Sequence, residues 1–119
     1  MVLVKNWTDL NAWQKAHQLV IHIYKITKTY PKDELYALIS QMRRASVSVA
    51  ANITEGFHRE TKKDRLHFYT MALTSLEEVK YYLILSKDLE YLDIKKAREI
   101  YSLTNEVGKL LRRWIQSQK

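Results

Sequence analysis

Basic side chains gather around one predicted turn of the chain, and their chemistry is that of phosphate binding. This turn cluster consists of His58, Arg59, Lys62, Lys63, Arg65 and His67, which only Glu60 and Asp64 offset. Lysine and arginine bind nucleic-acid phosphates with an affinity that adds up with charge and falls with salt. We therefore predict that Arg59, Lys62, Lys63 and Arg65 contact RNA or DNA. The alternative for these residues is ordinary solubilising surface charge.

A second basic set lies near the end of the chain and contains no acidic residue. This C-terminal cluster consists of Lys109, Arg112, Arg113 and Lys119. In an antiparallel bundle of four helices, the last helix ends beside the turn between the second and the third. We therefore expect Arg112 and Arg113 to join the turn cluster at one end of the molecule. A net charge of +7 and a pI near 9.6 agree with a polyanionic ligand.

No residue pattern in the chain indicates catalysis, and we expect no enzyme, no cofactor and no metal. The chain has no cysteine, which excludes disulfides, thiolate ligands and a cysteine nucleophile. Its two glycines lie far apart, so a glycine-rich phosphate loop is excluded as well. Glu55-x-x-His58 matches half of a di-iron signature, but a second copy is missing and Gly56 is expected to end the helix between them.

Four amphipathic segments must position these side chains. Apolar residues at steps of three and four predict helices over residues 10–29, 33–55, 62–89 and 94–116. Asp9, Thr61 with Asp64, and Asp93 are the expected N-terminal caps, and Gly56 is expected in a left-handed cap. Short connections favour an all-α, antiparallel up-down-up-down four-helix bundle in one domain over residues 1–119. Residues 1–8 are expected to be loosely ordered, with Trp7 packed against the bundle.

The segment from Ser40 to Gly56 combines a packing stripe with a charged face. The stripe is formed by Leu35, Ile39, Met42, Ser46, Val49 and Ile53, and small residues beside it allow a close helix approach. Arg43 and Arg44 are assigned either to an oligomer interface or to nucleic acid. Salt bridges to Glu55 or to a neighbouring subunit are the expected contacts in the first case.

The third helix carries more apolar surface than one bundle needs. Its second set consists of Met71, Tyr82, Leu85 and Leu89, and Ile21 and Val47 also lie off the main faces. A second stripe indicates self-association, and symmetry favours a homo-oligomer. The alternative is a tilted bundle whose edges these residues cover. Because the chain shows neither a signal peptide nor a membrane-spanning run, we expect a cytoplasmic protein with no membrane partner.

The sequence DLNAWQKAHQLVIHIYKITKTYPKDELYALISQMRRASVSVAANITEG, at residues 9–56, resembles the four-helix-bundle proteins encoded in intervening sequences of bacterial 23S rRNA genes. The resemblance continues through Arg59 and through SLEEVKYYLILSKDLEYL at residues 75–92. Thr54 departs from the alanine that is frequent in this family, and the fourth helix is the least distinctive part.

The resemblance implies a ring-like homopentamer with a central channel. Related proteins are accessory factors of reverse transcriptases in diversity-generating retroelements, and their basic surfaces are implicated in nucleic-acid binding. Arg43, Arg44 and Arg59 match family positions, and no catalytic residue is carried over. Two functions stay open: a non-enzymatic bundle that binds RNA or DNA, and a scaffold or accessory subunit that docks a polymerase-type protein without binding nucleic acid.

Overall fold

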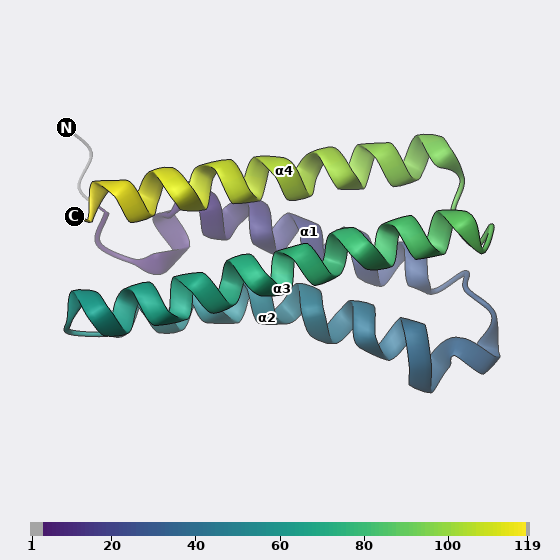
Figure 1. Cartoon of the computed structure of the whole chain (residues 1–119), viewed down its shortest axis with the longest axis horizontal. Helices are drawn as coiled ribbons and strands as arrows, with labels where there is room; N and C mark the ends of the chain where they lie inside the picture. The colour runs from purple at the N-terminus through teal and green to yellow at the C-terminus, as the bar shows by residue number, and fades with distance from the viewer. Residues whose placement is uncertain (1–3, 119) are drawn as a thin grey trace.

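The computed structural model describes residues 4–118, and within this range it is all-α, as predicted. Figure 1 shows four long helices side by side, with the α2–α3 connection, the start of α1 and the end of α4 at one end. The other two connections lie at the opposite end. The helices are α1 (Asn11–Thr27), α2 (Ser40–His58), α3 (Lys62–Asp88) and α4 (Ile94–Ser117).

The predicted stripes form the core, with one exception. The α3 stripe is at most 1% exposed at each of Tyr69, Ala72, Leu76, Val79 and Leu83. On the second helix, Leu35 was expected in the stripe but is 46% exposed. The reason is a π-helical turn at Leu35–Ile39, which precedes α2. One additional residue in that turn rotates Leu35 out of the register that Ile39 and Met42 keep.

Two of the predicted helix caps are confirmed, and one is wrong. The Thr61 hydroxyl accepts a hydrogen bond from the backbone N–H of Asp64 at 3.1 Å, and Asp93 accepts one from Lys96 at 2.8 Å. Asp9 does not cap α1, whose N-cap is Leu10. Its carboxylate instead accepts the backbone N–H of Asn6 at 3.3 Å and closes a 3-10 turn at Trp7–Asp9. This earlier turn occupies the only carboxylate that could have capped the helix.

The chain before α1 is more ordered than expected. Trp7 packs edge-on against Trp13 with ring centroids 4.8 Å apart, so its predicted packing is confirmed. Of the segment expected to be loose, residues 1–3 lie outside the described range. The second helix also begins differently, because a 3-10 turn at Lys32–Glu34 takes the place of the predicted helix start at Asp33.

Gly56 does not end α2 in a left-handed conformation, as we expected, but lies within the helix. No glycine has a positive φ among the described residues, and α2 continues to His58. The role of Gly56 is to leave space, because a Cβ atom there would lie 2.5 Å from Cε1 of Tyr69. The missing side chain therefore allows the Tyr69 ring of α3 to lie directly against the α2 backbone.

Candidate nucleic-acid interface

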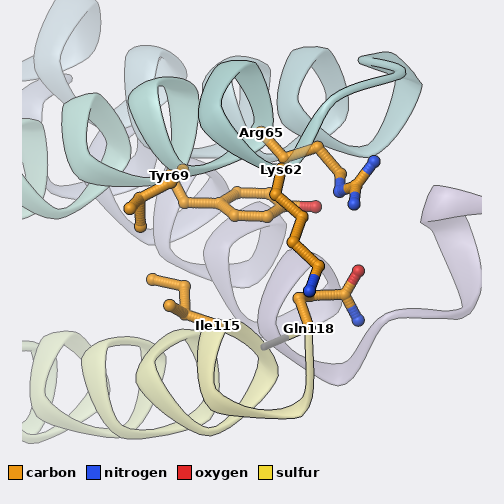
Figure 2. Close-up of a pocket in the computed structure, with 6 residues that line it drawn as sticks. Lys62, Arg65, Tyr69, Ile115 and Gln118 are labelled. Atoms are coloured by element: carbon orange, nitrogen blue, oxygen red, sulfur yellow. The ribbon is translucent and has the colours of Figure 1, made fainter.

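The two basic clusters lie at one end of the bundle, as the topology required. Figure 1 places the α2–α3 connection beside the last turns of α4. Side chains of both clusters' helices also line one small cavity: Lys62, Arg65, Leu66, Tyr69, Ile115 and Gln118 (Figure 2). With a volume of about 60 Å³, this cavity is too small for a nucleobase or a cofactor. The site is therefore a surface rather than a pocket.

Arg65 holds the α2–α3 turn together. Its Nη1 donates hydrogen bonds to the carbonyl oxygens of Arg59 at 3.2 Å and Glu60 at 2.8 Å. Its Nε is buried and has no hydrogen-bond partner among the described residues. Since these contacts fix the guanidinium against the backbone, Arg65 shapes the turn and has few donors left for a phosphate.

Arg59 is also engaged within the chain. Its Nη2 lies 2.9 Å from Oε2 of Glu55, and its Cζ lies 4.5 Å above the centroid of the Phe68 ring. The ion pair is half-exposed, so it contributes little to stability and can exchange for a phosphate. This contact also occupies the carboxylate of the Glu55-x-x-His58 motif, whose His58 Nδ1 lies 2.9 Å from the carbonyl oxygen of Thr54.

Lys62 and Lys63 are the most available cations of the turn cluster. Both are exposed at the start of α3, and no carboxylate of residues 4–118 lies within salt-bridge distance of either. Figure 2 shows the Lys62 side chain reaching from α3 towards Gln118, in the last turn of α4. Lys62 thus links the two basic clusters across the end of the molecule.

A buried hydrogen bond fixes the helices beneath this surface. Nε1 of Trp114 donates to the Tyr69 hydroxyl at 3.0 Å and joins α4 to α3. Burial raises the pKa of Tyr69, while this hydrogen bond and the positive charge of Arg65 act in the opposite direction. The phenol therefore stays protonated, and it keeps the end of α4 in place beside the start of α3.

The C-terminal cluster is divided between two sides of α4. Arg112 lies over Gly108, at which a Cβ atom would be 2.9 Å from Nη1, on the side that faces Leu76 of α3. Arg113 instead lines a groove between α4 and α1, together with Asp9. Adjacent residues of a helix point about 100° apart, which explains the division. Arg112 is thus the arginine on the α3 side, and Lys119 lies outside the described residues.

Arg43 and Arg44 are bound within the chain, but not to Glu55. Nε of Arg43 donates to Oγ1 of Thr27 at 3.0 Å, and its Cζ lies 4.6 Å from the Tyr24 ring centroid. Nη2 of Arg44 lies 3.1 Å from Oε2 of Glu78 on α3. The expected pairing with Glu55 is therefore wrong, because Arg59 occupies that carboxylate.

The predicted second apolar stripe of α3 is only partly exposed. Tyr82 and Leu85 pack against the core, whereas Met71 and Leu89 are 42% and 45% exposed. The structure therefore supports the edge-covering alternative for half of this set. Sequence reasoning placed the excess apolar surface on α3, but a larger uncharged area lies elsewhere.

This area is an open groove between α1 and α2, which we call the α1–α2 groove. It has a volume of about 410 Å³ and is lined by Trp7, Trp13, His17, Val20, Val47, Ala50, Ala51, Thr54 and Glu55. The rings of Trp13 and His17 are stacked with centroids 5.1 Å apart. Glu55 is the only charged residue in the lining. Its sequence signal was the off-face Val47 beside the small residues of α2.

No group of three or more metal-ligating side chains occurs within residues 4–118. Over the same part of the chain, no helix is long and apolar enough to cross a membrane. Ser48 and Ser75, on adjoining helices, share a hydrogen bond of 2.9 Å. Serines in this region therefore serve close helix packing, as their small size indicated.

Comparison with known proteins gives one family and one solved fold. The model of the 23S rRNA-intervening sequence protein family matches residues 8–113. A crystal structure of a protein of unknown function from Bacteroides thetaiotaomicron, described as belonging to the S23 ribosomal protein family, has a TM-score of 0.81. It is 24% identical, and the match covers 88% of this chain and 95% of that one. No curated protein matches significantly.

Proposed function

This chain belongs to the 23S rRNA-intervening sequence protein family, and we propose that it is a non-enzymatic, up-down-up-down bundle that binds RNA or DNA through phosphate contacts. The observation that carries the proposal is the pair of exposed lysines at the start of α3. Lys62 and Lys63 have no acidic partner among the described residues, and Arg112 lies on the adjoining helix at the same end. We expect Arg59 to join them by exchanging Glu55 for a phosphate, whereas Arg65 shapes the turn.

Binding is expected to depend steeply on salt and little on sequence. Three or four phosphate contacts per bundle predict a slope of about −2 to −3 in a plot of log K against log salt for a single strand. Fluorescence anisotropy of labelled 20-nucleotide RNAs of different sequence, over a series of salt concentrations, measures this slope. A flat salt response, or no binding at low salt, would contradict the proposal.

The same proposal includes a homo-oligomer, a ring-shaped homopentamer by resemblance to the family, in which the α1–α2 groove forms the subunit contact. Several observations support this face. It carries aromatic and small side chains, Val47 is 42% exposed, and Glu55 is the one charge in its lining. Copies that each carry a charge of +7 associate with least repulsion through an uncharged face. A ring of copies would also repeat the basic end around its axis.

Replacing Val47 with glutamate is expected to convert the oligomer to monomers, because a charge in an apolar interface lacks a partner. Size-exclusion chromatography with light scattering measures the mass of the assembly. Ile84→Glu is the matched control, since Ile84 is 43% exposed on α3 and lies outside the groove. A wild-type monomer, or dissociation by Ile84→Glu alone, would show that this assignment is wrong.

A further inference from the structure

The surface between α3 and α4 combines exposed aliphatic side chains with basic ones. Leu66 and Ile115 line the cavity at the basic end, and Ile84 and Ile94 line a second cavity at the other end. We call this strip the α3–α4 seam. Leu66, Ile84 and Ile94 are 46%, 43% and 52% exposed. Exposed aliphatic residues aligned along one seam are typical of a surface that binds a partner.

The second cavity has the composition of an anchor site for one apolar side chain. Its volume is about 170 Å³, and it is lined by Leu83, Ile84, Lys87, Ile94, Ala97, Arg98 and Tyr101. Buried Leu83 and Ala97 form an apolar base, and Lys87 and Arg98 add positive charge. Such a cavity accepts a leucine-sized side chain that has a carboxylate nearby.

The charges of α4 are separated between its two sides. Arg98 and Arg112 lie on the α3 side, whereas Glu106 pairs with Lys15 of α1 at 3.6 Å. On α3, the carboxylates of Glu77 and Asp88 already lie within 3.3 Å of Lys80 and Lys87. The seam is therefore basic, and its complement is an acidic surface. A second copy of this chain, with its charge of +7, does not supply a generally acidic one.

The aliphatic character of the seam favours a protein over a nucleic acid. Nucleobases bind by stacking on aromatic rings or arginine planes. The described seam offers two aromatic rings, of which Tyr69 is buried and Tyr101 is half-buried with the ammonium of Lys80 5.9 Å from its centroid. Isoleucine and leucine side chains instead pack against the apolar face of a helix.

We propose that the α3–α4 seam is a docking groove for an acidic amphipathic helix of a partner protein. Apolar residues of that helix enter the cavities at Leu66 and at Ile84, and its carboxylates lie against Lys87, Arg98 and Arg112. From Leu66 to Ile84 there are 18 residues of α3, or about 27 Å of helix. A partner helix of about 18 residues therefore spans both cavities. This docking site is independent of nucleic-acid binding at Lys63 and of oligomerisation.

The test uses the full chain and a labelled 18-residue peptide with leucine at helix positions i, i+3, i+4 and i+7 and glutamate at the exposed positions. Fluorescence anisotropy is expected to show micromolar binding, which a scrambled peptide of the same composition reproduces at least tenfold more weakly. Ile84→Ser with Ile94→Ser is expected to weaken binding about tenfold. Arg98→Glu, which leaves the apolar surface intact, is expected to do the same.

Met71→Ser is the matched control, because Met71 is 42% exposed on the same helix and points about 140° away from Ile84. It is expected to change binding less than twofold, and circular dichroism confirms that each variant is folded. Equal binding of both peptides, or unchanged binding by the double serine variant and by Arg98→Glu, would overturn the proposal. So would an equal loss of affinity for a labelled 20-nucleotide RNA in the double serine variant. Failure of the wild type to bind RNA would leave the peptide result standing.

Discussion

Replacing Gly56 with alanine is expected to lower the free energy of unfolding by about 1–2 kcal/mol. The new Cβ would lie 2.5 Å from Cε1 and 2.8 Å from Cδ1 of Tyr69. The Tyr69 ring is 1% exposed, and Trp114 holds its hydroxyl, so the ring has little room to move. Overpacking of this kind costs about 1–3 kcal/mol, which exceeds the gain of up to about 1 kcal/mol from helix propensity. Urea unfolding followed by circular dichroism measures the difference.

Gly108→Ala is the matched control, because the neighbours there can move. Its Cβ would meet the end of the exposed Arg112 side chain at 2.9 Å and Cδ2 of Leu76 at 3.3 Å. The helix propensity of alanine then dominates, and we expect an unchanged or slightly higher stability. The cost of Gly56→Ala should also shrink in a Tyr69→Leu background, since the smaller side chain leaves space for the methyl group. An equal cost in both backgrounds would show that Tyr69 is not the cause.

The four helices could be predicted from the sequence because each has a continuous apolar period. The stripe from Tyr69 to Leu83 is buried as expected, and the caps at Thr61 and Asp93 follow from side chains that act within one turn. Leu35 and Gly56 could not be placed in this way. The π-helical turn changes the register only locally, and the space at Gly56 is set by Tyr69, which is thirteen positions away on another helix.

The candidate site was predictable as a set of charges but not as a set of available charges. Sequence position alone brought Lys62, Arg65 and Arg112 to the same end. It did not show that Arg65 binds the backbone of its own turn or that Arg59 pairs with Glu55. Such contacts depend on side-chain conformations within one turn of chain, and these have no periodic signal. Arg113 was misleading for a simpler reason, since one residue along a helix changes the side on which a charge lies.

Reversing both charges in Lys62→Glu with Lys63→Glu is expected to weaken RNA binding by roughly one to two orders of magnitude. The variant removes two phosphate contacts and places two negative charges beside the backbone of the ligand. The slope of log K against log salt should fall by about two, one for each lost contact. Because both side chains are exposed and without an acidic partner among the described residues, the fold should tolerate the change. Anisotropy of the labelled RNA over a salt series measures both quantities.

The matched control is Lys25→Glu with Lys28→Glu, which alters the net charge of the chain by the same amount. Both lysines are exposed at the end of α1, on the opposite end of the bundle from the α2–α3 connection. If long-range attraction by the net charge dominated binding, the two variants would lose affinity equally. If the start of α3 contacts the phosphates, only Lys62→Glu with Lys63→Glu changes the salt slope by about two. An equal slope change in both variants would therefore remove the contact surface from this end of the bundle.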